Sequence, residues 1–244
     1  MAGHSKWANI KFRKSLQDSR RGKIFTKLIR EITISTRLGG GDVNSNPRLR
    51  AAVEKALSQN MTRETIDRAI KRGIGDASGN LLEEIRYEGH GAGGGAVIVE
   101  CMTDNRKRTV SEVRHLFNKF GGNLGTDGSV SYLFRKRGQI LFEPGSVDEE
   151  PLLDLALDAG AEDLIVAEDG SLEIVTDVEH FEAVRDKINQ AKIIYDKAEL
   201  GLLPESYIQL NADQMQTFIK LIDGLEDLDD VQTVHYNVEL EYPD

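Results

Sequence analysis

The sequence has a single cysteine, Cys101, among its 244 residues. One cysteine forms neither an intramolecular disulfide nor a cysteine zinc cluster, and such sparse use suits a reducing compartment, so we expect a cytoplasmic protein. No apolar run approaches the roughly 18 residues of a membrane-spanning helix, so we expect no membrane partner. The opening residues lack the apolar core of a secretion signal, although their Arg-rich, acid-poor composition leaves a mitochondrial transit peptide as an alternative.

Metal and nucleotide motifs are missing as well. The five histidines, at positions 4, 90, 115, 180 and 235, are scattered without metal-ligand spacing. Residues 89–94 match the pattern G-x-G-x-x-G by letters. Dinucleotide binding requires this loop to open a helix, whereas the residues after it read as a strand, so a mobile hairpin loop is the better interpretation. We therefore expect no cofactor and no metal.

The chain also offers no coherent catalytic set. Cys101 falls in an apolar predicted strand, which is more typical of a buried small hydrophobe than of a nucleophile. The acid-rich residues 223–230 miss the spacing of a calcium loop and are expected to form a solvated turn. Residues 135–137, Arg-Lys-Arg, lie between two predicted strands and read as a solvated linker. The sequence therefore predicts a protein that is not an enzyme and has no small-molecule substrate.

What the chain has is a strong separation of charge. The formal net charge is −10, but residues 1–80 hold 17 basic and 7 acidic side chains. Residues 138–244 hold 5 basic and 27 acidic side chains. Such asymmetry points to contact with a polyanion through one end of the molecule only. The acidic part would repel nucleic acid and leave a surface for a protein partner.

The most basic stretch is residues 3–30, with nine Lys or Arg and one acid, Asp18. Lysine and arginine neutralise phosphates, and an aromatic ring such as Trp7 can stack on an unpaired base. A second basic cluster opens a predicted helix at residue 106, where backbone amides favour anions. The candidate nucleic-acid-binding residues are Lys6, Trp7, Lys11, Arg13, Lys14, Arg20, Arg21, Lys23, Lys27, Arg106, Lys107 and Arg108. The alternative is that the basic segment docks on the protein's own acidic part.

Periodicity predicts an α+β protein. Apolar residues at helical spacing indicate helices between residues 24 and 73, with Asn46 capping a helix that starts at Pro47. Residues 139–203 read as β-α-β-β-α-β, the ferredoxin-like arrangement, with a capping box from Thr176 to Glu179. Strands at 95–102, 129–134, 206–210 and 231–240 would complete a second such unit around the first. A row of three consecutive units with a stray tail is the alternative.

We expect three domains on this basis. They are a basic arm and three-helix domain at residues 1–80, a discontinuous α+β domain at 81–135 and 204–244, and an inserted acidic ferredoxin-like domain at 136–203.

Several stretches together resemble the YebC/PmpR family over essentially the full length. They are AGHSKWANIKFRK, GKIFTKL, YEGHGAGGGA, TDNRKRTVSEVRHLFNKFGGNLG and GSVSYLF. The resemblance implies a helical domain followed by two α/β domains, the third inserted in the second. It also implies that the family's basic motif corresponds to Lys6, Trp7, Lys11, Arg13, Lys14 and residues 20–23. In the glycine-rich loop, His90 and Ala92 stand where relatives often have an aromatic residue and a proline.

The resemblance implies a function in gene expression. Members of the family are described as DNA-binding transcriptional regulators, and others as ribosome-associated factors that help translation through difficult sequences. We therefore expect a non-enzymatic nucleic-acid-binding regulator with DNA as its partner. A translation factor that binds ribosomal RNA and relieves stalled elongation is the alternative, because no predicted helix shows clear base-reading side chains.

Overall fold

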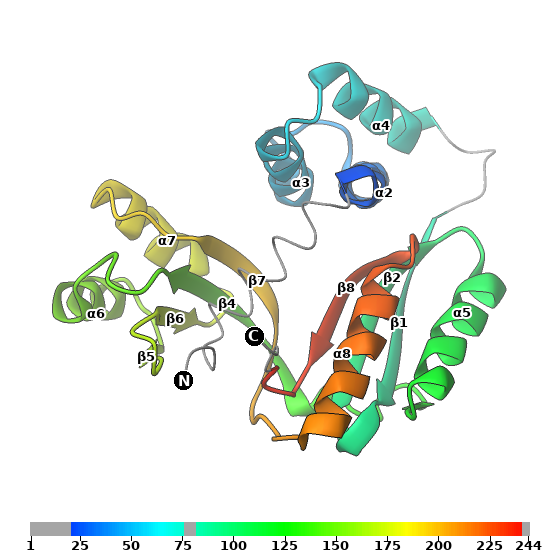
Figure 1. The fold of residues 1–244 in the computed structure, drawn as a ribbon. Helices are drawn as coiled ribbons and strands as arrows, with labels where there is room; N and C mark the ends of the chain where they lie inside the picture. The colour runs from blue at the N-terminus through cyan, green and yellow to red at the C-terminus, as the bar shows by residue number, and fades with distance from the viewer. Residues whose placement is uncertain (1–20, 76–81, 241–244) are drawn as a thin grey trace.

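The computed structural model describes residues 21–75 and 82–240, and its N-terminal part is a bundle of helices (Figure 1). The helices are α2 (Arg21–Gly39), α3 (Pro47–Ser58) and α4 (Arg63–Gly75). As predicted, Asn46 caps α3, and its side chain accepts a hydrogen bond from the backbone N–H of Leu49 at 3.1 Å. The apolar faces of the helices meet in a core of Leu28, Ile32, Leu49, Ala52, Ala56, Met61, Ile66 and Ala69.

The middle of the molecule is an antiparallel sheet with helices on one face. Its elements are β1 (Glu83–His90), β2 (Ala96–Thr103), α5 (Arg106–Lys119), β3 (Asn123–Leu124), α8 (Ala212–Glu226) and β8 (Val231–Tyr236). The strands lie in the order β3-β1-β2-β8. Strand β2 is buried on both faces, because Val97 and Val99 pack under α5 and α8 while Ile98 packs against Phe134 on the other side.

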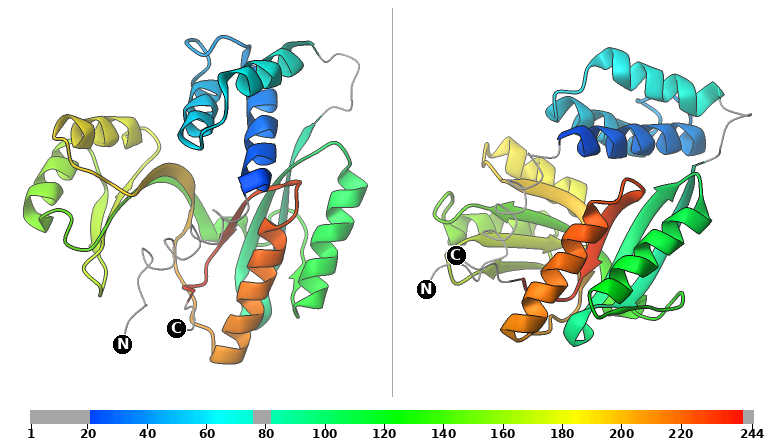
Figure 2. Two further views of the ribbon diagram at one scale, coloured as in Figure 1. Left: turned by 45° about the horizontal axis from the view of Figure 1, so that its top comes forward. Right: turned by 45° about the vertical axis from the view of Figure 1, so that its right-hand side comes forward.

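A second antiparallel sheet lies beside the first (Figure 2). Its elements are β4 (Phe134–Phe142), α6 (Glu149–Asp158), β5 (Asp163–Val166), β6 (Leu172–Thr176), α7 (Phe181–Gln190) and β7 (Lys197–Pro204). The chain order β-α-β-β-α-β and the spatial order β5-β6-β4-β7 are those of a ferredoxin-like unit, as predicted.

After β7 the chain returns to the first sheet, where β8 pairs with β2 in the register Val99↔Val234. The C-terminal elements are therefore no stray tail. The strand predicted at residues 206–210 does not join the first sheet, where β1 pairs with the edge of β2 that β8 leaves open. That segment makes one isolated bridge, between Ile208 and Val238. We propose domain boundaries at residues 80, 135 and 203, in keeping with this return of the chain.

The strand predicted at residues 129–134 is wrong. Residues Ser131–Leu133 form a 3₁₀ turn instead. The backbone N–H groups of Val130 and Ser131 donate to the buried carboxylate of Glu88 at 2.8 and 2.9 Å, so they are not available to a neighbouring strand. Strand β4 then begins at Phe134, and residues 135–137 pair with β7 rather than forming a solvated linker.

The capping box predicted for α7 is also wrong. The helix begins at Phe181, and Glu179 lies before it. The carboxylate of Asp177 accepts a hydrogen bond from the backbone N–H of His180 at 2.7 Å, which holds residues 177–180 in a turn ahead of the helix. A side chain that bonds the local backbone in this way competes with helix formation over the same residues.

The glycine-rich loop between β1 and β2 is packed, which corrects the expectation of a mobile hairpin. A Cβ atom on Gly91 would come within 2.7 Å of the Phe218 ring, and one on Gly95 within 2.6 Å of Val238. Glycine at these positions lets the loop backbone lie directly on α8. The loop therefore contributes to the core under α8 rather than opening a helix for a cofactor.

Candidate nucleic-acid interface

The first half of α2 is held against the end of α8 by its cationic side chains. We call residues 226–230, which include four acidic residues, the acidic turn. The Lys23 ammonium lies 2.8 Å from the Asp227 carboxylate, and Lys27 donates to the carbonyl of Glu226 at 3.0 Å. Helix α8 has no basic residue in its last turn, although the carbonyls of a helix C-terminus carry partial negative charge. Lys23 and Lys27 of α2 supply positive charge at this helix end.

Asp230 is the centre of this contact and is only 2% exposed. Its carboxylate accepts hydrogen bonds from Arg30 and from Arg108, each at 2.7 Å. Thr103 and Thr109 donate to it as well, at 3.1 and 2.7 Å. Burial by itself would raise the pKa of Asp230, but the hydrogen bonds from Arg108 and Thr109 and the charge of Arg30 outweigh it and hold the pKa below its ordinary value.

This network overturns the expectation that residues 223–230 form a solvated turn. Asp230 joins α2, β2 and α5, which lie far apart in the sequence, through its two carboxylate oxygens. A lone acidic run gives no sign of such a role, because the partners are supplied by distant segments. Burial also lowers the pKa of Lys27, against the opposing charge of Glu226, so this lysine belongs to the same contact.

The predicted binding residues fall into three groups. Lys6, Trp7, Lys11, Arg13, Lys14 and Arg20 lie outside the described residues, and Arg21 opens α2. Lys23 and Arg108 form ion pairs with Asp227 and Asp230, and Lys27 donates to the backbone carbonyl of Glu226, so these three side chains have partners within the protein. Arg106 lies 3.6 Å from Glu83, and Lys107 is exposed. A nucleic-acid role for all of them stays a prediction.

Helix α5 carries further cations that the sequence prediction missed. Arg114 and Lys119 are exposed on the same helix as the basic cluster at its start. Val113 and Phe117 are buried under the sheet and fix which side of the helix faces solvent. Helical spacing could have found Arg114, since it stands seven residues after Lys107 and so nearly two turns along the same face.

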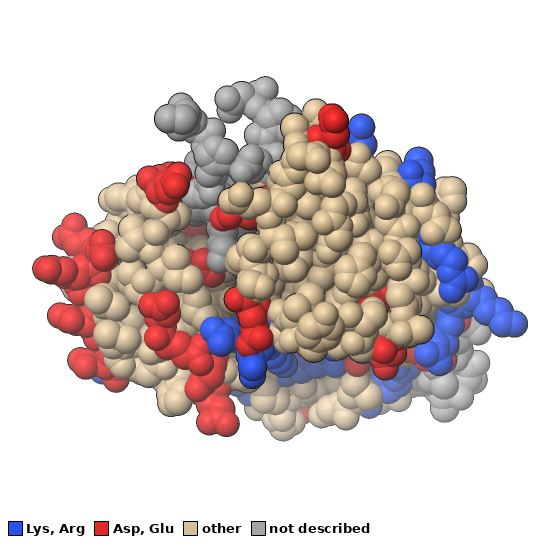
Figure 3. All heavy atoms as spheres, turned by 90° about the horizontal axis from the view of Figure 1, so that it is seen from below, with Lys and Arg blue, Asp and Glu red and all other residues tan. Residues whose placement is uncertain are grey.

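Charge separates in space as it does along the chain. Seen from below, acidic side chains crowd the end of the molecule formed by α6, α7 and β5, and basic side chains gather along the opposite edge, where α5 lies (Figure 3). Such a distribution orients a polyanion toward the α5 edge and away from the second sheet.

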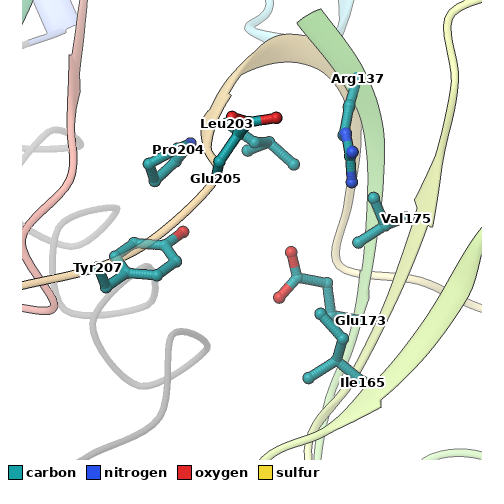
Figure 4. A pocket seen from close by; sticks show the side chains of 8 residues that line it. All are labelled: Arg137, Ile165, Glu173, Val175, Leu203, Pro204, Glu205 and Tyr207. Atoms are coloured by element: carbon teal, nitrogen blue, oxygen red, sulfur yellow. The ribbon is translucent and has the colours of Figure 1, made fainter. Parts of the chain in front are cut away.

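A cavity of about 300 Å³ lies on the helix-free side of the second sheet. Arg137 and Glu173 face it from β4 and β6, and Tyr207 borders it from the segment after β7 (Figure 4). Arg137 is 3.3 Å from Glu162, and Glu173 accepts a hydrogen bond from Gln139 at 2.6 Å. The lining holds carboxylates of the wrong sign for a phosphate, and no nucleophile stands beside a base within it.

The described residues contain no cluster of metal-ligating side chains, and their one cysteine is buried. In the ranges 21–75 and 82–240, no three His, Cys, Asp or Glu side chains are placed to hold a metal ion. Cys101 is 2% exposed, and burial raises the pKa of its thiol to about 12, so the nucleophilic thiolate is suppressed. Within the same ranges, no helix combines the length and apolar character needed to cross a membrane.

Two models of one protein family match most of the chain. Residues 5–76 match the model of the TACO1/YebC protein N-terminal domain, and residues 82–238 match that of the TACO1/YebC second and third domain. A probable transcriptional regulatory protein of Alcanivorax borkumensis is 57% identical over 244 residues, covering 100% of this chain and 98% of the relative. One from Idiomarina loihiensis is 56% identical over 240 residues, covering 98% and 96%.

A solved structure agrees with these matches. The crystal structure of a conserved hypothetical protein from Aquifex aeolicus superposes with a TM-score of 0.81 at 46% sequence identity, covering 93% of each chain. Both the sequence matches and the fold extend over nearly the whole chain, so the chain belongs to the TACO1/YebC family.

Proposed function

We propose that this protein is a non-enzymatic, nucleic-acid-binding regulator of gene expression that works in the cytoplasm. The observation that carries the proposal is the separation of charge, with 17 basic against 7 acidic side chains in residues 1–80 and 5 against 27 in residues 138–244. A basic end attracts phosphates while an acidic end repels them, so the bound nucleic acid is oriented. The full-length relatives named probable transcriptional regulatory proteins support the same role.

The proposal assigns different tasks to the parts of the chain. The basic residues before α2, together with Arg21 at its first position, contact the phosphate backbone. The acidic second sheet faces away from it and offers a surface to a protein partner. DNA is the proposed target, on the strength of the relatives' names, and ribosomal RNA is the result that would redirect the proposal to translation.

Crosslinking in cells identifies the target. We expect the tagged full-length chain, irradiated in living cells and purified under denaturing conditions, to carry DNA fragments enriched in promoter sequences. A variant with Lys11, Arg13, Lys14 and Arg20 changed to Glu should lose the crosslinked material, because charge reversal removes the phosphate contacts. Recovery of ribosomal RNA alone would contradict a DNA target, and recovery of no nucleic acid at all would contradict the proposed function.

A further inference from the structure

One face of α5 presents a regular row of side chains to solvent. Lys107, Ser111, Arg114 and Asn118 are all exposed and stand four, three and four residues apart, so they share one side of the helix. We call these four residues the α5 stripe. A different side of the helix packs on the sheet through Val113 and Phe117. The stripe is therefore exposed to solvent on a helix that lies at the edge of the molecule, on the side away from the second sheet (Figure 1).

The charges of α5 work against its own helix dipole. Its first turn holds Arg106, Lys107 and Arg108 and no acidic residue, although the N-terminus of a helix is its positive pole. Asp104 and Asp230 offset the charge of Arg108, and Glu83 lies 3.6 Å from Arg106. Lys107 has no ion-pair partner among the described residues. A cation that costs the helix stability and has no partner in the protein is typical of a side chain kept for a ligand.

Arg114, further along the stripe, resembles Lys107 in these respects. It is exposed, and within residues 21–75 and 82–240 it also has no ion-pair partner. Seven residues at 1.5 Å each separate it from Lys107 by about 10 Å along the helix axis. One strand of a duplex carries a phosphate about every 3.4 Å of its axis, so such a span follows roughly three phosphates. Asn118 adds an amide donor one turn beyond Arg114, and Ser111, whose hydroxyl donates to the carbonyl of Lys107 at 2.9 Å, is a small spacer between the cations.

We propose that the α5 stripe binds the sugar–phosphate backbone of a nucleic acid, as a second contact separate from the basic residues at the start of the chain. The inference rests on the proposed function and deepens it by adding a site with named residues. Lys107 and Arg114 neutralise phosphates, and Asn118 donates a hydrogen bond to a phosphate oxygen. Lys107 and Arg114 have no ion-pair partner to leave among residues 21–75 and 82–240, in contrast to Lys23 and Arg108, which form ion pairs there, and to Lys27, which donates to a backbone carbonyl.

The test compares two doubly charge-reversed, full-length proteins. One carries Lys107→Glu and Arg114→Glu. The control carries Lys187→Glu and Lys192→Glu, at exposed positions in the acidic ferredoxin-like unit. Affinity is measured for a labelled random-sequence DNA duplex and, separately, for a labelled RNA hairpin. We expect the α5 variant to bind more weakly than the wild type and the control to bind as the wild type does.

Salt dependence makes the expectation quantitative. Loss of two phosphate contacts lowers the magnitude of the slope of log affinity against log salt by about 1.8. The ratio of the wild-type affinity to the affinity of the α5 variant should therefore fall about tenfold between roughly 50 and 200 mM salt. Thermal unfolding is measured in parallel. Glu at position 107 suits the helix dipole, so the α5 variant should be no less stable than the control. If the α5 variant unfolds at a lower temperature than the control, a variant with Lys107→Gln and Arg114→Gln replaces it. This variant should also bind more weakly than the wild type, by a smaller factor.

The outcomes separate this inference from the proposed function. If the wild type binds but the α5 variant keeps the same affinity and the same salt slope, the α5 site is overturned and the proposed function is unaffected. Equal losses in the α5 variant and the control would overturn it too, because they would show a general effect of net charge. A wild type that binds neither probe would overturn the proposed function itself. Loss on one probe only would identify that nucleic acid as the ligand of the stripe.

Discussion

Raising the salt concentration from about 50 to 200 mM is expected to weaken nucleic-acid binding by this protein roughly 1000-fold, if about six phosphates are contacted. Each contacted phosphate releases condensed counterions on binding, and added salt opposes that release. The six proposed contacts are those of Lys6, Lys11, Arg13, Lys14, Arg20 and Arg21, and they exclude Lys23 and Lys27, which α2 places on the acidic turn. Cations of the α5 stripe would steepen the dependence further.

Fluorescence anisotropy of a labelled duplex, titrated with the protein at several salt concentrations, gives this slope directly. The Lys187→Glu/Lys192→Glu control should reproduce it, since these residues lie in the acidic ferredoxin-like unit. An affinity that stays flat with salt would rule out phosphate contact as the source of binding.

Replacing Asp230 by alanine is expected to lower the free energy of unfolding by about 3–5 kcal/mol, the range seen when one partner of a buried ion pair is removed. The change leaves the guanidinium groups of Arg30 and Arg108 without the carboxylate that both contact at 2.7 Å. Urea denaturation of both proteins gives the difference. The matched control is Asp229→Ala, whose exposed side chain should cost no more than about 0.5 kcal/mol. Similar costs for the two variants would show that Asp230 does not hold α2 in place.

The same carboxylate predicts a dependence on pH. The folded state lowers the pKa of Asp230, so its stabilisation is present in full above the ordinary pKa of an aspartate and is lost as the pH falls through the lowered value. The difference in stability between the wild type and Asp230→Asn should therefore be greatest near neutral pH and shrink in acid. A difference that grows in acid would contradict the sign of the shift.

Local signals in the sequence predicted much of the fold. The cap at Asn46, followed by Pro47, set the start of α3 correctly, and the alternation of strands and helices after residue 138 gave the ferredoxin-like order. The failures have a common cause. Residues 129–134 look like a strand, but Glu88, more than 40 residues earlier, takes the amides that a strand would need. A contact over that separation leaves no local pattern.

The candidate site was predictable from the sequence only in part, for the same reason. The excess of basic residues is readable from composition, and the exposed positions of α5 follow from helical spacing. The acidic turn is different, because nothing near Asp230 in the sequence reveals that Arg30 and Arg108 converge on it. Three cations that look equivalent to their neighbours in the sequence, Lys23, Lys27 and Arg108, are engaged within the protein, and only the fold separates them from Lys107 and Arg114.

The most direct measurement is the affinity of the purified full-length protein for labelled DNA and RNA at low salt, before and after Lys11, Arg13, Lys14 and Arg20 are changed to Glu. Four lost contacts should flatten the salt slope by about 3.6 and reduce the affinity by orders of magnitude, while the thermal unfolding of the described core is retained. Binding that is as tight after the four changes as before would show that the basic opening of the chain serves something other than a phosphate backbone.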